Sequence, residues 1–195
     1  MESYSNSAEN KAIAPVDIQK ECSSYLTGAK NESREDTRPV KKISDSITET
    51  SRIVEHNDIN AENRLFGGRL MEWIDEAASL TAIRHSECRI TTASIDNLEF
   101  KQGAYLGNII VIRAKITHVG RTSMEIRVDS YREDKETGLR HPINRAYLVV
   151  VCIDDEGHPK EVPYRVVPET VSEEAEWEGA LKRLKYRKKR IKEGF

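Results

Sequence analysis

Apolar and polar residues alternate with a period of two along much of the second half of the chain. In "NIIVIRAKITHV", residues 108–119, one face carries Ile110, Ile112, Ala114 and Ile116, and the other carries Arg113, Lys115 and Thr117. "TSMEIRVDSYRE", residues 122–133, repeats the pattern. Such alternation is typical of half-buried antiparallel strands. Further strands are predicted over 43–55, 89–100 and 144–154, and Gly120-Arg121 predicts a two-residue hairpin turn with glycine first.

A single long helix is predicted over residues 68–85, within "GRLMEWIDEAASLTAIRH". One face consists of Leu70, Ile74, Ala77 and Thr81. Other apolar residues widen this face almost all round the helix, and a helix of that kind is normally enclosed. One helix among five strands predicts an α+β fold, in which the long central helix is wrapped by one strongly curved antiparallel sheet.

The two ends of the chain differ from this middle part. Residues 1–42 are polar, with seven basic and seven acidic side chains, and we expect a disordered or loosely packed tail. The domain itself is expected over 43–167. Residues 168–195 predict a charged helix that is acidic first and basic later, as the helix dipole favours. Its basic part, from Lys182 to Lys192, is either a solvated surface, a site for a phosphorylated ligand or a nucleic-acid surface.

Composition excludes several classes of protein. A net charge of -2 over 195 residues argues against a general nucleic-acid binder. No apolar run approaches the roughly 20 residues of a membrane span, and the first ten residues lack the features of a secretory signal. The three cysteines and five histidines show no metal-binding spacing. We therefore expect a cytoplasmic, metal-free protein with no membrane or nucleic-acid partner.

Candidate chemistry gathers just before the long helix, in "HNDINAENRLFGGRL". The first N–H groups of a helix are unpaired and carry a partial positive charge. Gly67 and Gly68 leave them open to the close approach of a carbonyl group, and a carboxylate and an amide, Asp58 and Asn60, lie nearby. The same residues also fit an ordinary turn, with Asp58 and Asn60 in local bonds to the backbone. The residues alone leave both interpretations open.

Four blocks of the sequence resemble the hotdog-fold acyl-CoA thioesterases, in the acyl-CoA hydrolase branch. These blocks are "HNDINAENRLFGGRLMEWIDEAASLTA", "TTASIDNLEF", "VGRTSMEIRVDSY" and "VPYRVVPET" with the charged helix after it. They occur in the family's order and cover about residues 44–190. The resemblance implies hydrolysis of fatty acyl-CoA to a free carboxylic acid and CoA, with no cofactor other than the CoA of the substrate. The alternative is a non-catalytic, regulatory hotdog protein that binds acyl-CoA.

The resemblance also assigns roles to residues. Asp58, ten residues before Gly68, corresponds to the family's catalytic acid and acts as base or nucleophile, and Asn60 corresponds to a catalytic asparagine. In two-domain relatives these groups come from different halves, which implies a site shared between two subunits of a homodimer or of a trimer of dimers. Asp75 and Glu76 both lie in the middle of the long apolar helix, and because acids are rarely buried without a partner, we expect them at a helix edge or near the acyl channel. Related branches use a helix acid, so the resemblance makes Glu76 a second candidate base. Three residues are expected at the CoA entrance: Arg121, Thr122 and Ser123.

Overall fold

The computed structural model describes residues 36–194 of the chain. Most of the predicted tail, residues 1–42, therefore lies outside the described residues. The regular elements in chain order are η1 (Ile43–Ser46), β1 (Thr48–Ile53), η2 (His56–Asp58), α2 (Gly67–Ser86), β2 (Arg89–Phe100), β3 (Ile109–Val119), β4 (Ser123–Glu133), β5 (Arg140–Ile153) and α3 (Val171–Glu193).

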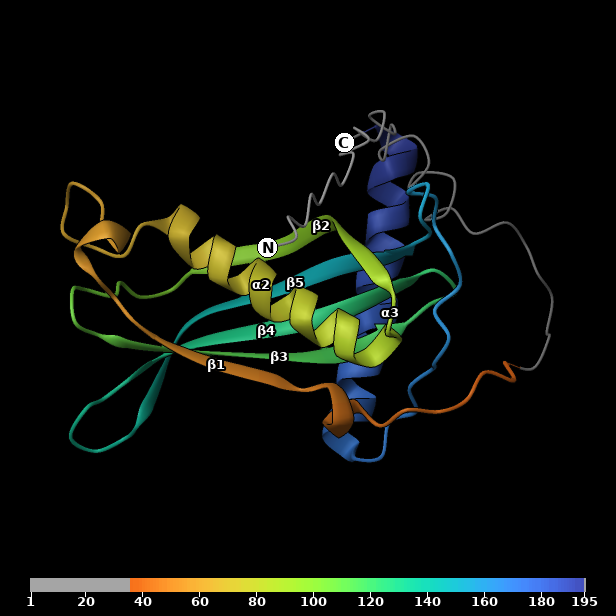
Figure 1. The fold of residues 1–195 in the computed structure, drawn as a ribbon, viewed down its shortest axis with the longest axis horizontal. Coiled ribbons are helices and arrows are strands. Elements are labelled where there is room, and N and C mark those ends of the chain that lie inside the picture. The colour runs from red at the N-terminus through yellow and green to blue at the C-terminus, as the bar shows by residue number, and fades with distance from the viewer. Residues whose placement is uncertain (1–35, 195) are drawn as a thin grey trace, which may run out of the picture.

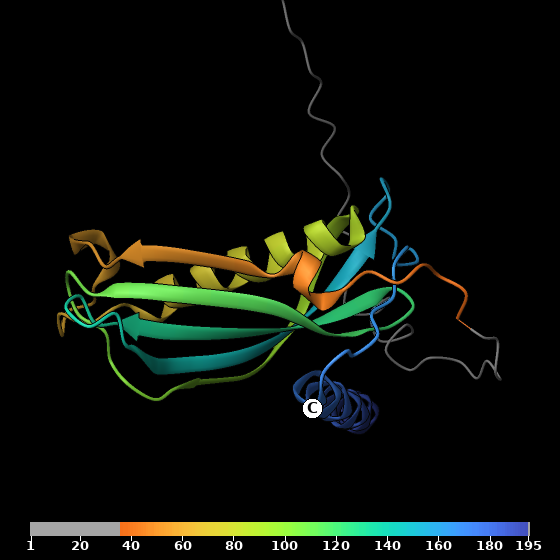
Figure 2. The same ribbon diagram turned by 90° about the horizontal axis from the view of Figure 1, so that it is seen from below.

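The five strands form one antiparallel sheet in the order β1-β3-β4-β5-β2. The sheet curves around α2, which lies against one of its faces, while α3 lies on the opposite face (Figures 1 and 2). The period-two pattern explains these layers. In β4, Met124, Ile126 and Val128 join the core beneath α2, and the side chains between them face α3.

Two local predictions were wrong. The residues from Ile43 to Ser46 form a 3-10 helix, and strand β1 begins only at Thr48. Gly120 does not have the positive φ that a hairpin turn with glycine first requires, and three residues, 120–122, separate β3 from β4. Within the described part of the chain, no helix combines the length and the apolar character of a membrane span.

The predicted apolar face of α2 packs against the sheet. Leu70, Ile74, Ala77 and Thr81 are all buried. The helix is not enclosed all round, however. Three apolar side chains on its outward side remain exposed: Met71 at 39%, Leu80 at 42% and Ile83 at 46%. The neighbouring strand β2 is an edge of the sheet, so α2 and β2 together leave apolar surface uncovered in a single subunit.

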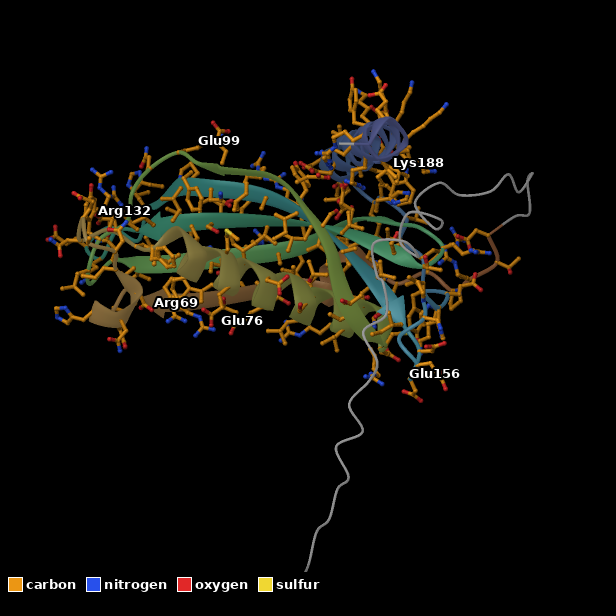
Figure 3. The ribbon with its side chains drawn as sticks, turned by 90° about the horizontal axis from the view of Figure 1, so that it is seen from above. Arg69, Glu76, Glu99, Arg132, Glu156 and Lys188 are labelled. Atoms are coloured by element: carbon orange, nitrogen blue, oxygen red, sulfur yellow. The ribbon has the colours of Figure 1, made fainter. Side chains whose placement is uncertain are left out.

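Helix α3 is joined to the outer face of the sheet by a chain of ion pairs. Arg187 is only 5% exposed and contacts both Asp96 on β2 and Glu125 on β4, each at 2.8 Å. Arg183 pairs with Glu125, and Arg190 pairs with Asp96. Three arginines of the predicted basic region thus face the sheet, while Lys188 of the same helix, labelled in Figure 3, is half-buried and forms no ion pair within residues 36–194.

The histidine under α3 makes the stability of this interface depend on pH. Burial lowers the pKa of His118, which packs on Trp177 with 4.6 Å between ring centroids, below its usual 6.5. The unfolded chain then takes up a proton more readily than the folded one, so the free energy of unfolding falls as pH drops below about 6.5. We expect a lower urea midpoint at about pH 5.5 than at about pH 7.5.

The substitution His118→Phe tests the origin of this pH dependence. It should flatten the difference in urea midpoint between the two pH values without removing it, because burial also lowers the pKa of His85. A variant with the same pH dependence as the wild-type protein would show that His118 does not contribute.

Candidate active site

The backbone N–H groups of Gly67 and Gly68 at the start of α2 are unpaired within residues 36–194, and these two residues have no side chains to cover them. Phe66 is the N-cap, and no side chain caps the helix. A Cβ atom built on Gly67 would lie 3.2 Å from the Phe100 ring, and one built on Gly68 would lie 2.6 Å from the Phe66 ring. Both positions therefore fit glycine best, and the helix start remains close to two half-exposed aromatic rings.

Asn60 has a side chain held in a fixed orientation. Its Oδ1 accepts hydrogen bonds from the backbone N–H groups of Glu62, at 2.9 Å, and Arg64, at 3.1 Å. This is the local bonding that a loop asparagine commonly makes. The oxygen is thereby occupied, whereas no hydrogen bond among residues 36–194 uses the amide nitrogen Nδ2. The side-chain NH₂ group remains available as a donor.

Asp58 is engaged through both carboxylate oxygens. Oδ2 accepts the backbone N–H of Glu55 at 2.9 Å and closes a capping box around η2. Oδ1 lies 3.1 Å from the Nε atom of Arg69. These contacts shape the loop and attach it to the first turn of α2.

Asp75 and Thr92 form a pair that the sequence alone did not single out. The Thr92 hydroxyl donates to Oδ1 of Asp75 at 2.7 Å, which joins the middle of α2 to β2. Both residues are partly exposed at the edge of the sheet. The only sequence signal for Thr92 was that it is a polar residue at a position of β2 that faces α2.

Glu76, the predicted second base, lies elsewhere. It is half-exposed and pairs with Arg52 of β1. Figure 3 shows it at the outer edge of the molecule, on the side of α2. Asp75 and Glu76 are adjacent in sequence but point in different directions around the helix, so only Asp75 reaches β2.

These groups form two separate centres within one subunit. Asn60 and Gly67 lie at the start of α2, and Asp75 is eight residues further along the helix, a rise of about 12 Å. The predicted CoA residues are at the turn between β3 and β4, with Arg121 exposed. Ser123 and Thr91 both pair with Val151, so this turn lies at the same end of the sheet as Thr92.

A cavity of about 400 Å³ adjoins the start of α2. It lies between the loop that carries Asn60 and the segment that follows β2. Its lining consists of Asn60, Arg64, Leu65, Gly67, Leu70, Phe100, Lys101, Gln102, Gly103, Ala104 and Ile143.

Among residues 36–194, one group of potential metal ligands occurs, in the turn after β5. The ligand atoms of Asp154, Glu156 and His158 lie within 4.8 Å of one another. The Asp154 carboxylate already accepts the backbone N–H groups of the other two residues, so hydrogen bonding within the turn explains why the three side chains lie close together. The absence of a metal stays a prediction.

Several known proteins similar to this chain are named acyl-CoA thioester hydrolases or acyl-CoA thioesterases. The sequence profile of the thioesterase superfamily matches residues 62–139. The uncharacterized acyl-CoA thioester hydrolase YkhA of Bacillus subtilis is 38% identical over 144 residues, which cover 74% of this chain and 83% of YkhA. The chain belongs to the acyl-CoA thioester hydrolases of the thioesterase superfamily.

Solved structures of this superfamily confirm the predicted hotdog fold. An acyl-CoA hydrolase from Staphylococcus aureus in complex with coenzyme A matches with a TM-score of 0.76 and 35% identity, over 80% of this chain and 93% of the other. An apo-hexameric acyl-CoA thioesterase matches with a TM-score of 0.74 and 38% identity, over 78% and 97%.

The Staphylococcus aureus structures include three variants, in which an asparagine, an aspartate or a threonine is replaced by alanine. Their residue numbers place the aspartate 15 positions after the asparagine, and the threonine 17 positions after the aspartate. In this thioesterase-superfamily chain, Asn60 is the only asparagine with an aspartate 15 residues later, and that aspartate is Asp75. Thr92 follows 17 residues further on.

Proposed function

We propose that the protein hydrolyses acyl-CoA thioesters to a carboxylic acid and CoA, at sites that two identical subunits share. The observation that carries this proposal is the hydrogen bond from Thr92 to the Asp75 carboxylate. Asn60, Asp75 and Thr92 also have the same spacing along the chain as the three residues replaced in the Staphylococcus aureus hydrolase. The chain also belongs to the acyl-CoA hydrolases, so the substrate class and the site support each other.

Asn60 and the start of α2 are suited to bind the thioester carbonyl oxygen. The Asn60 NH₂ group and the N–H groups of Gly67 and Gly68 are donors, and the helix adds a partial positive charge. As the carbonyl carbon is attacked, its oxygen gains negative charge, which fixed donors stabilise without rearranging. One such donor is typically worth about 2.7–4 kcal/mol of barrier. Since Oδ1 of Asn60 is held by two backbone amides, its NH₂ group is already oriented.

Asp75 is the group we propose for the attack. As a base, it takes a proton from a water molecule whose oxygen adds to the carbonyl carbon; as a nucleophile, it adds to that carbon itself and water then cleaves the anhydride. In either case the carbon–sulfur bond breaks, and CoA leaves as a thiolate that takes up a proton. Thr92 orients the carboxylate by donating to Oδ1. Water is the only co-reactant, so we propose no cofactor.

Asp58 remains the alternative acid from the sequence. We favour Asp75 because both oxygens of Asp58 are engaged by Glu55 and Arg69, whereas only Oδ1 of Asp75 has a partner among residues 36–194. For Glu76, the ion pair with Arg52 at the outer edge of α2 argues against a catalytic role.

The shared site follows from the separation along α2. Asp75 lies about 12 Å further along α2 than Gly67, which lines the same cavity as Asn60, so we propose that Asn60 and Asp75 act on the same substrate from different subunits. The exposed apolar residues of α2, including Leu80 and Ile83, together with the free edge of β2, provide a surface for a second subunit. The hexameric relative supports a homo-oligomer, and we propose that CoA extends toward Arg121, Thr122 and Ser123.

Subunit mixing tests both the function and the shared site. Wild-type protein should release CoA from acyl-CoA, measured with a thiol reagent, and Asn60→Ala and Asp75→Asn should each be nearly inactive. Co-expression of the two variants should restore up to about one quarter of wild-type activity, because half of randomly paired dimers contain one intact site out of two.

Two outcomes would contradict the proposal. No recovery on mixing would place Asn60 and Asp75 in one subunit's site or in separate roles. Failure of the wild-type protein to release CoA from any acyl chain length, with acyl-CoA still bound in calorimetry, would favour a binding protein.

A further inference from the structure

We propose that Arg64 and Lys101 form an anion-binding subsite in the cavity beside Gly67, and that it holds a negatively charged group of the substrate. This inference rests on the proposed function, because it concerns the same substrate. The cavity of about 400 Å³ contains both cationic side chains in its lining, together with Asn60 and Gly67.

The first argument is that these two cations have no acidic partner among residues 36–194. Most arginines in that part of the chain form ion pairs, including Arg69 with Asp58 and Glu72 at the start of α2. None of the ion pairs there includes Arg64 or Lys101, and neither the Arg64 guanidinium group nor the Lys101 ammonium group makes a hydrogen bond within residues 36–194. Two positive charges therefore border one cavity without an internal counter-charge.

The second argument is that hydrogen-bonded backbone holds both residues in place. Arg64 pairs with Tyr105 in an isolated β-bridge, and its carbonyl accepts the N–H of Asn60 at 2.8 Å. The N–H of Lys101 donates to the carbonyl of Ile143 at 2.9 Å. Their backbones are thus fixed relative to the loop of Asn60, so only the side chains need to order when an anion binds.

The third argument concerns the chemistry of the ligand. A guanidinium group binds carboxylates and phosphates with paired hydrogen bonds, and an ammonium group adds a compact charge. Leu65, Leu70 and Ile143 supply apolar wall in the same cavity, which suits a short methylene chain. Because Asn60 and Gly67 also line it, the bound anion belongs to the molecule whose thioester they hold. It is either a carboxylate at the far end of the acyl group or a phosphate of CoA.

Three substrates separate these two sources: butyryl-CoA, glutaryl-CoA and butyryl-pantetheine. The variants are Arg64→Gln and Lys101→Gln. Arg132→Gln is the matched control, because Arg132 is an arginine outside the cavity at the end of the β4–β5 hairpin, without an ion pair in the described residues (Figure 3). The measured quantity is kcat/KM for each pair of variant and substrate.

A charged hydrogen bond lost from the substrate should lower kcat/KM by about 10- to 100-fold. A loss confined to glutaryl-CoA identifies the acyl carboxylate. A loss with both CoA thioesters, but not with butyryl-pantetheine, identifies a CoA phosphate. Values equal to those of Arg132→Gln for all three substrates overturn the subsite.

Failure of the proposed function would be distinguishable from failure of this inference. If the wild-type protein releases no CoA or pantetheine from any of the three thioesters, the hydrolase proposal fails, and calorimetric titration with the same three compounds then tests the subsite. Weaker binding by Arg64→Gln than by Arg132→Gln, for either CoA thioester, supports it. Equal binding by the two variants overturns it.

Discussion

Replacing Asp75 with asparagine is expected to lower kcat for acyl-CoA hydrolysis by about 10²–10⁴-fold, the usual contribution of a positioned general base. Asparagine keeps the size of the side chain and an oxygen that can accept the Thr92 hydroxyl, so the contact between α2 and β2 should survive. The loss should therefore appear in kcat, and circular dichroism and the urea midpoint should remain close to the wild-type values.

The matched control is Asp58→Asn, which removes one negative charge from the loop before α2. Because Asp58 already binds the Glu55 amide and Arg69, this change should weaken the loop and raise KM more than it lowers kcat. Glu76→Gln should leave kcat nearly unchanged. If Asp58→Asn lost most of its kcat while Asp75→Asn remained active, Asp58 would be the catalytic base, as the family resemblance implied.

A smaller effect is expected for the residue that orients the carboxylate. Thr92→Val removes the hydroxyl that donates to Asp75 and keeps the branched shape of the side chain. If Thr92 is a positioning residue, kcat should fall less than in Asp75→Asn, and Thr92→Ser, which restores the hydroxyl, should recover most of it. A purely structural role would instead change the urea midpoint, with kcat unaffected.

The fold was accessible from the sequence because its periodicities are strong. Alternation in β3 and β4 located those strands to within one residue at each end, and the 3.6-residue spacing from Leu70 to Thr81 identified the buried face of α2. The 3-10 turn at Ile43 was missed because Ile43, its one apolar residue, is β-branched, and four residues are too few to show a helical repeat. Its conformation depends on packing that a short pattern does not encode.

The pairing of Asp75 with Thr92 could not be derived from the pattern. The two residues are 17 positions apart, and their contact depends on the angle at which α2 crosses β2. The same holds for α3. Its basic residues suggested a surface patch, but three of its arginines pair with Asp96 and Glu125. Alternation places Glu125 on the polar side of β4, whereas Asp96 reaches the same face of the sheet only because β2 shifts its register between Thr92 and Ser94. Alternation distinguishes the two faces of a strand, yet it does not reveal that a helix covers the polar face.

Replacing Arg187 with alanine is expected to reduce the free energy of unfolding by about 3–5 kcal/mol, the usual cost of removing one partner from a buried ion pair. The substitution would leave Asp96 and Glu125 beneath α3 with one cation fewer, and Glu125 is itself only 2% exposed. The control is Lys188→Ala on the same helix, since Lys188 forms no ion pair within residues 36–194. It should change the free energy of unfolding by less than about 0.5 kcal/mol.

Urea unfolding followed by both circular dichroism and tryptophan fluorescence measures this loss and its extent. Trp177 of α3 packs on His118 of the sheet, and Trp73 of α2 is buried in the core, so tryptophan emission reports both the docking of α3 and the unfolding of the domain. If α3 is an integral part of the domain, both signals should shift together to lower urea in Arg187→Ala. An earlier fluorescence change would mean that α3 detaches while the sheet stays folded. A shift no larger than that of Lys188→Ala would mean that the buried ion pairs merely offset their own desolvation, in which case apolar packing around Ala180 holds the helix in place.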